Sequence, residues 1–163
     1  MKQGKQILQK IFSKEELKLQ IKRWKLKGKK IVFTNGVFDI LHEGHIKILS
    51  EAATYADILI VGINSDASVK RLKGDSRPIH SEASRSLLLA ALLVTDAIIS
   101  FEEDTPLNLI NFINPDVLVK GGDYTLETIV GAKEVIATGG DVKIIPLEEG
   151  FSTTNIIKTL SQE

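Results

Sequence analysis

The sequence has no cysteine among its 163 residues, which excludes disulfide bonds, thiolate metal sites and a thiol nucleophile. It also has no apolar stretch near the roughly 18 residues that a membrane-spanning helix needs. Residues 1–12 carry lysines but no continuous apolar core, so we expect neither a secretory signal nor membrane insertion. The remaining composition is typical of a globular protein. We therefore expect a single cytoplasmic domain that covers residues 1–163.

A formal net charge of zero conceals two oppositely charged regions. Residues 1–30 hold 11 Lys and Arg against two Glu, whereas residues 31–163 hold 10 against 19 Asp and Glu. Such a basic arm can bind nucleic acid or an anionic membrane surface. However, Leu17, Ile21 and Trp24 recur at helical spacing and form one apolar stripe. We interpret residues 1–28 as a helical extension that docks through this stripe and leaves its lysines in solvent.

Strand and helix patterns alternate along the chain. A helix at 14–27 ends at Gly28 and precedes a first strand at 30–34. Near-continuous apolar runs indicate buried strands at 57–63, 97–100, 116–119 and 141–145. Helices are expected at about 44–55, 81–94, 105–113 and 126–138, with a last one starting at 152–154. This order predicts an α/β, Rossmann-like fold with a doubly wound parallel sheet of about five strands.

Polar and glycine-rich loops follow three of the predicted strands, at 34–45, 120–123 and 149–154. Ligands of open parallel sheets bind beyond the carboxyl ends of the strands. In the first loop, His42 and His45 flank Gly44 at the start of a helix. A helix N-terminus has free backbone N–H groups and a partial positive charge, so it attracts phosphate. These features predict a nucleotide site.

Four segments, in this order, are similar to a known family. Segment 34–45, TNGVFDILHEGH, resembles the HxGH signature of the nucleotidyltransferase superfamily, and segment 152–158, STTNIIK, resembles its second signature. Segments 64–74 and 119–124 resemble the heptose 1-phosphate adenylyltransferase domain. In many organisms that domain is the C-terminal half of a bifunctional protein that also contains a sugar kinase. The resemblance covers about residues 13–163.

The resemblance implies the transfer of AMP from ATP to D-glycero-β-D-manno-heptose 1-phosphate. The products are pyrophosphate and ADP-heptose, a precursor of the lipopolysaccharide core. The resemblance also implies Mg²⁺ bound with the ATP phosphates, and a homodimer. No nucleic-acid partner is expected, although a non-catalytic nucleotide- or nucleic-acid-binding module is the alternative from another class. Cytidylyltransferases that act on glycerol 3-phosphate usually carry an arginine that segment 147–150, LEEG, lacks. A cytidylyltransferase acting on this or a related alcohol phosphate remains the closer alternative.

The acceptor phosphate is already an anion, so the reaction needs no general base, and the enzyme must align the reactants and neutralise developing charge. We expect four catalytic residues: Thr34, His42, His45 and Lys73. We expect the nucleotide to contact Thr34, Asn35, Gly36, Phe38, His42, Gly44, His45, Arg85, Lys120, Gly121, Gly122, Asp123, Ser152, Thr153 and Thr154. Asp39 and Lys73 are expected to bind the acceptor, and no metal ligand is assigned in the protein.

Several of these residues have a second interpretation. The two histidines of segment 34–45 could simply cap a helix, and the hydroxyls of segment 152–154 could do the same. Glycines in segment 120–123 could serve only a tight turn. The cations Lys70, Arg71, Lys73 and Arg77 form either a solvated face or a mobile loop that closes over phosphates. His80 lies outside every motif and is interpreted as an ordinary loop residue.

Overall fold

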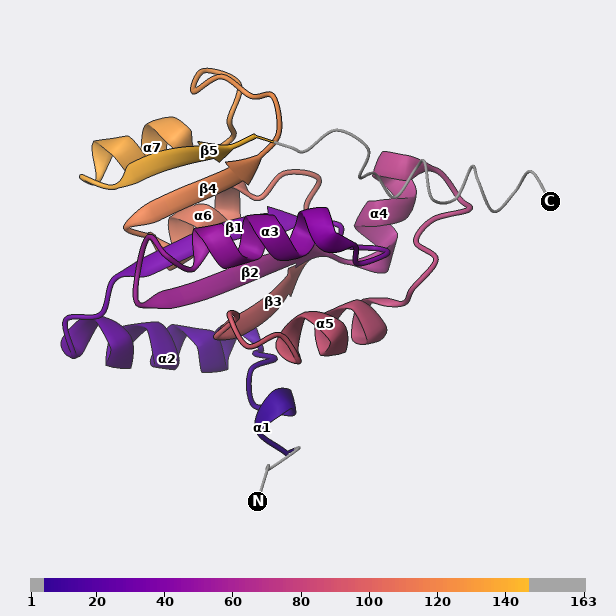
Figure 1. Ribbon diagram of the computed structural model, residues 1–163, viewed down its shortest axis with the longest axis horizontal. Coiled ribbons are helices and arrows are strands. Elements are labelled where there is room, and N and C mark those ends of the chain that lie inside the picture. Colours follow the sequence, from indigo (N-terminus) through magenta and orange to yellow (C-terminus); the bar gives the residue numbers. More distant parts are fainter. Residues whose placement is uncertain (1–4, 147–163) are drawn as a thin grey trace.

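The computed structural model describes residues 5–146. Its five strands form one sheet, all of whose neighbouring pairs are parallel, in the order β3-β2-β1-β4-β5 (Figure 1). The strands are β1 Ile31–Gly36, β2 Ile58–Asn64, β3 Ala97–Phe101, β4 Val117–Gly121 and β5 Asp141–Ile145. This arrangement confirms the predicted Rossmann-like sheet.

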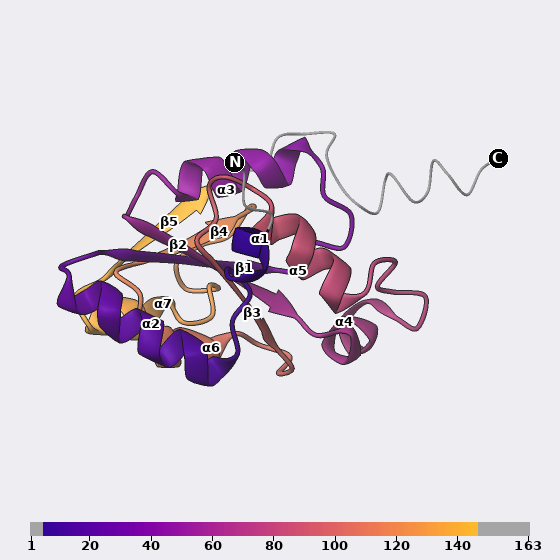
Figure 2. The ribbon, with the colours of Figure 1, turned by 90° about the horizontal axis from the view of Figure 1, so that it is seen from below.

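Helices cover both faces of the sheet. They are α1 Lys5–Leu8, α2 Lys14–Leu26, α3 Glu43–Ala52, α4 Asp66–Lys73, α5 Glu82–Ala90, α6 Leu107–Ile113 and α7 Ala132–Ala137. Figure 2 shows α3 and α5 on one face and α2 and α6 on the other. The helices α3 and α5, which lie between β1 and β3 in the chain, therefore cover one face of the sheet. The connection from β3 to β4, through α6, covers the other face.

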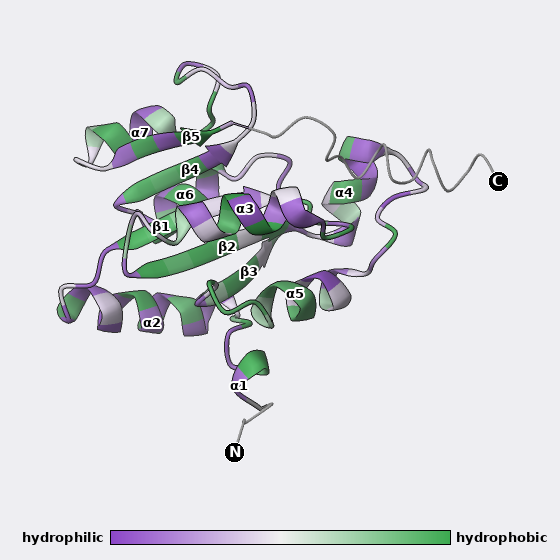
Figure 3. Ribbon diagram, in the orientation of Figure 1, coloured by the Kyte–Doolittle hydropathy of each residue, from purple (hydrophilic) through white to green (hydrophobic). Residues whose placement is uncertain are grey.

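Two hydrophobic cores result from the alternation of side chains along the strands. Val32 belongs to the core beneath α3 and α5, whereas its neighbour Phe33 belongs to the core beneath α2, α6 and α7. Both side chains have no exposed surface. In Figure 3 the strands are accordingly the most hydrophobic elements, and polar residues lie along the outer faces of the helices.

The basic N-terminal region packs against the domain as the apolar stripe predicts. Leu17 and Ile21 of α2 are buried, and Trp24 packs against the same core. Lysines on the other faces of α2 are exposed. Ahead of α2, Ile11 forms a parallel bridge with Ile98 of β3, so residues 10–12 extend the edge of the sheet. The four-residue helix α1 is an addition to the prediction.

We expect Ser13→Ala to destabilise the protein by about 1 kcal/mol, because Ser13 caps α2. Its hydroxyl accepts a hydrogen bond from the Glu16 amide at 3.3 Å, and the Glu16 carboxylate accepts one from the Ser13 amide at 2.9 Å. Thermal denaturation should show a melting temperature about 2–4 °C lower. Ser50→Ala, on the exposed side of α3, is the control. Equal melting temperatures for both variants would contradict the role of the cap.

Several helices and strands differ from the sequence-based expectation. Residues 66–73 form α4, where Ser65 accepts a hydrogen bond from the Ser68 amide as N-cap, so Lys70, Arg71 and Lys73 lie on a helix rather than in a loop. Helix α7 starts at residue 132 rather than 126, because Gly131 has a φ of 87° and breaks the helical path. Strand β1 extends to Gly36, which pairs with Ile63.

Within the part of the chain that the structure describes, no helix is long and apolar enough to cross a membrane.

Candidate functional site

The strand order places a topological switch point at the carboxyl ends of β1 and β4. These two strands are adjacent, yet the chain leaves β1 toward α3 on one face and leaves β4 toward α7 on the other (Figure 2). Ligands bind at such switch points in open α/β sheets. Segments 34–45 and 120–123 meet there, as predicted, whereas segment 152–154 with Ser152, Thr153 and Thr154 lies outside the described residues.

The loop after β1 turns sharply around a phenylalanine. Phe38 is buried and has a φ of 50°, in the left-handed region that a bulky residue rarely adopts. Its ring packs so closely that a Cβ atom added to Gly36 would lie 3.0 Å from it. On its other side, the ring centroid of Phe38 is 5.1 Å from that of His45. Strained backbone of this kind clusters at functional sites, and here it orients a histidine.

The two histidines are stacked at the start of α3. Their ring centroids are 3.8 Å apart and their planes differ by 27°. His42 occupies the N-cap position, but its side chain makes no capping hydrogen bond, and the first turn is closed by its backbone carbonyl. The alternative that both imidazoles merely cap the helix therefore does not fit the geometry. Gly44, between them, is buried.

Both imidazoles favour the neutral form. Burial and, as a smaller cause, the neighbouring His42 together lower the pKa of His45 to about 4. Burial also lowers the pKa of His42, against the opposing effect of Glu43. Within residues 5–146, Nδ1 of His45 is buried without a hydrogen-bond partner. A neutral imidazole offers one N–H donor and one acceptor. Near pH 7 the two histidines can therefore donate to phosphate oxygens without either ring having to carry a buried positive charge.

Lys120, a half-buried residue of β4, lies at the same switch point. Lys120 donates a hydrogen bond from Nζ to the side-chain oxygen of Asn35 on β1 at 2.7 Å. Burial lowers the pKa of Lys120 to about 8. The side chain of Lys120 is thus held between β4 and β1 at the switch point.

The two glycines after Lys120 allow the backbone of this segment to lie close to neighbouring residues and to turn tightly. A Cβ atom on Gly121 would collide with Ile48 of α3, and Gly122 has a φ of 136° that only glycine adopts easily. Both features support the tight-turn interpretation, which is compatible with nucleotide binding. Asp123 is exposed at the start of the following loop. Thr34, 98% buried, lies on β1 in register with Val119 of β4.

The carboxylate of Asp39 is buried inside the protein. Its carboxylate accepts hydrogen bonds from the amides of Ile79 at 2.8 Å and His80 at 2.9 Å, and it pairs with Arg77. Burial raises the pKa of Asp39, but the hydrogen bonds from His80, Ile79 and Arg77 outweigh this effect and lower it. With 1% of its side chain exposed, Asp39 offers little surface to an acceptor, and its role in substrate binding stays a prediction.

Arg85 is also buried, with 0% of its surface exposed. Its guanidinium donates hydrogen bonds to the carbonyls of Val37 and His80 and to the carboxylate of Asp66. In this arrangement it does not reach open space, so its expected contact with the nucleotide stays a prediction. Lys73, by contrast, is exposed in the last turn of α4.

Sequence reasoning did not identify two of the residues that organise this edge. Arg77 was grouped with the surface cations, yet it pairs with buried Asp39, and Asp66 was not singled out. Arg71, from the same group, pairs with Asp104 at 2.9 Å on the surface. A charge pair between residues that are far apart in the sequence produces no recognisable spacing pattern. Such pairs become visible only in the folded structure.

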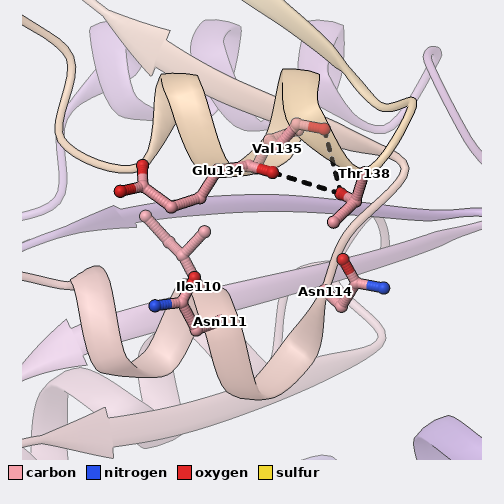
Figure 4. A pocket seen from close by; sticks show the side chains of 6 residues that line it. All are labelled: Ile110, Asn111, Asn114, Glu134, Val135 and Thr138. Atoms are coloured by element: carbon pink, nitrogen blue, oxygen red, sulfur yellow. Dashed lines mark hydrogen bonds between the residues drawn. The ribbon is translucent and has the colours of Figure 1, made fainter.

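A pocket between α6 and α7 lies away from these groups (Figure 4). It is lined by Ile110, Asn111, Asn114, Glu134, Val135 and Thr138. Its residues precede β4 and β5 in the chain, so the pocket lies near the amino ends of these strands, at the edge of the sheet opposite the histidines. Thr138 donates hydrogen bonds to the carbonyls of Glu134 and Val135 at the end of α7. With one titratable side chain among its lining residues, the pocket does not resemble a catalytic centre.

The parallel sheet, the switch point and the HxGH motif at the start of α3 together define a Rossmann-like α/β protein of the HxGH type. The chain belongs to the cytidylyltransferase-like family, whose model matches residues 33–159. It is 54% identical over 153 residues, 94% of its length, to the protein named bifunctional protein HldE of Escherichia coli O139:H28. It spans 32% of that relative. The resemblance predicted from the four motifs is thus confirmed.

Two solved structures share the fold. The lipopolysaccharide core biosynthesis protein from Thermoplasma volcanium GSS1 has 32% identity and a TM-score of 0.59, with 74% of this chain and 97% of that chain covered. Pantoate-beta-alanine ligase from Francisella tularensis, solved with beta-gamma ATP and beta-alanine, has a TM-score of 0.61. At 14% identity over 93% of this chain and 76% of its own, the ligase indicates the fold alone.

Proposed function

We propose that this chain is a nucleotidyltransferase that transfers AMP from ATP to D-glycero-β-D-manno-heptose 1-phosphate and releases pyrophosphate. The observation that carries the proposal is the stacked, neutral pair His42 and His45 at the start of α3, beside the switch point. Family membership supports nucleotidyl transfer. The likeness to HldE and to the lipopolysaccharide core biosynthesis protein supports the sugar phosphate as acceptor. On the same resemblance, we propose a homodimer in the cytoplasm.

The proposed mechanism is a direct in-line displacement. The anionic acceptor oxygen attacks the α-phosphorus, the bond to the β-phosphate oxygen breaks, and pyrophosphate leaves with the electron pair. His42 and His45 donate hydrogen bonds to phosphate oxygens as charge moves toward the leaving group. Lys120 contributes positive charge from β4, and Thr34 contributes a hydroxyl from within β1. Lys73 on α4 and the hydroxyls of segment 152–154 would complete the contacts with the phosphates.

Mg²⁺ is the proposed cofactor, carried by the ATP phosphates. When bound, it neutralises charge on the phosphate oxygens. Within residues 5–146, no group of three or more His, Asp or Glu side chains could hold a metal. The ion would therefore take most of its ligands from the phosphates and water, as Mg²⁺ commonly does in nucleotide sites.

A pyrophosphate-release screen tests this function. ATP, CTP, GTP and UTP are each paired with heptose 1-phosphate, glycerol 3-phosphate and other sugar phosphates, with and without Mg²⁺. We expect release only with ATP, heptose 1-phosphate and Mg²⁺ together, and release at least about 100-fold slower from a His45→Ala preparation. Turnover with CTP and glycerol 3-phosphate instead would refute the substrates and leave nucleotidyl transfer intact. Absence of turnover, with salt-sensitive nucleic-acid binding that survives His42→Ala, would favour the binding-module alternative.

A further inference from the structure

We infer that Arg85 and Asp39 are positioning residues that hold segment 77–80 and the start of α4 against the loop of the two histidines. They do so without contacting the nucleotide or the acceptor. The inference rests on the proposed function, because it concerns the alignment of that reaction. It departs from the motif-based expectation that Arg85 binds phosphate and Asp39 binds the acceptor.

Arg85 joins three segments that are distant in the sequence. Its Nη1 donates to the carbonyl of Val37 at 2.8 Å, and its Nε donates to the carbonyl of His80 at 3.1 Å. Its Nη2 pairs with the carboxylate of Asp66, the first residue of α4, at 2.8 Å. A planar guanidinium provides these donors in fixed directions, which a lysine cannot reproduce. One fully buried side chain thus sets the spacing of the loops that follow β1 and β2.

Asp39 holds the same segment from the other side. Its Oδ1 accepts from the amides of Ile79 and His80, and its Oδ2 accepts from Arg77. His80 is therefore held at both backbone groups, its amide by Asp39 and its carbonyl by Arg85. Because both carboxylate oxygens and three guanidinium nitrogens already have partners, a ligand would have to displace internal hydrogen bonds to reach either group.

The segments held in this way carry the proposed catalytic groups. Val37 precedes strained Phe38, whose ring contacts His45. Asp66 begins α4, which carries Lys73 in its last turn. A shift at either contact changes the distance between the histidine pair and the cations of α4. Phosphoryl transfer depends on this alignment, since a displacement of about 1 Å can cost about 100-fold in rate.

Arg85→Lys and Asp39→Asn test the inference, with Arg23→Lys on the exposed face of α2 and Asp141→Asn on β5 as matched controls. Titration calorimetry gives the Kd of ATP, pyrophosphate release gives kcat and KM, and assays run at least 15 °C below each melting temperature. We expect kcat to fall about 10- to 50-fold in both variants, with the Kd of ATP changed less than threefold. The controls should match the wild type.

Two outcomes would overturn the inference. A Kd for ATP, or a KM for the acceptor, that weakens as much as kcat falls would show that these groups bind ligand. An unchanged kcat with only a lower melting temperature would show a purely structural role. If Arg85→Lys does not fold, Arg77→Lys is measured instead and judged by the same criteria. This substitution weakens the contact with Asp39, and the Arg77 side chain is 15% exposed. If the pyrophosphate-release screen identifies another nucleotide or acceptor, kcat, Kd and KM are compared in the same way with those substrates. Failure of the proposed function therefore does not by itself decide whether Arg85 and Asp39 are positioning residues.

Discussion

His45→Ala is expected to lower kcat by about 10²- to 10³-fold, the usual cost of removing one preorganised donor to developing charge. The Kd of ATP should change less than about threefold, since the contact strengthens mainly in the transition state. The His45 ring is held between Phe38 and His42, so it is oriented before substrate arrives. Single-turnover kinetics and calorimetry separate the two effects.

His80→Gln is the control for this variant, because it removes the third imidazole but keeps the backbone groups that Asp39 and Arg85 hold. We expect its kcat to stay within about threefold of the wild type. If His45→Ala and His80→Gln had equal kcat values, His45 would have no part in the mechanism.

The pH dependence of the wild-type enzyme should reflect the low pKa of His45, about 4. The neutral imidazole is the expected active form, so the contribution of His45 to kcat should not titrate near the ordinary histidine value of 6.5 and should be lost as the pH approaches 4. Between pH 4 and 6.5 the unfolded chain binds the proton and the folded chain does not. Stability should therefore also fall as the pH is lowered through this window.

Lys120→Met is expected to lower kcat/KM by about 100-fold while making the protein more stable near pH 7. The substitution removes the cation at the switch point but keeps an apolar chain of similar length beside Asn35. Burial holds the pKa of Lys120 near 8 against an ordinary value of 10.5, so the folded state bears a desolvation cost of at most about 3.4 kcal/mol. Removing that charge should recover part of this free energy.

The same pKa predicts two pH profiles. Wild-type kcat/KM should fall above pH 8 as Lys120 loses its proton, and this fall should disappear in Lys120→Met. Between pH 8 and 10.5 only the unfolded chain keeps the proton, so wild-type stability should rise with pH there, relative to Lys120→Met. Denaturant unfolding at several pH values measures this. A variant that is both active and less stable would contradict the assignment.

Much of the fold could be predicted because its strands are buried on both faces. Runs such as residues 58–63 consist of apolar residues that only a covered parallel sheet accommodates. Helix α4 was missed because its sequence, DASVKRLK, buries only Ser68 and Val69 and otherwise looks like a solvated polar segment. The cap at Ser65 was the available signal. The start of α7 depends on a positive φ at Gly131, which spacing does not reveal.

The parts of the candidate site that lie within one contiguous motif could be predicted from the sequence. The contacts between segments that are distant in the sequence could not. The stacking of His42 on His45 follows from their spacing at the start of one helix. The contact of Lys120 with Asn35 depends on β1 and β4 being neighbours, which is a property of the strand order. The partners of Arg85 are 48, 19 and 5 residues away in sequence, so no local pattern could assign them.

The central claim, nucleotidyl transfer by the centre that contains His45, is tested most directly by following the α-phosphate of ATP. The enzyme is incubated with [α-³²P]ATP, Mg²⁺ and heptose 1-phosphate, and the products are separated by chromatography. The label should move into a nucleotide sugar in a one-to-one ratio with released pyrophosphate, and the rate should fall at least about 100-fold in His45→Ala. Label that appears in free AMP or on the protein, or equal rates for both enzymes, would contradict the account.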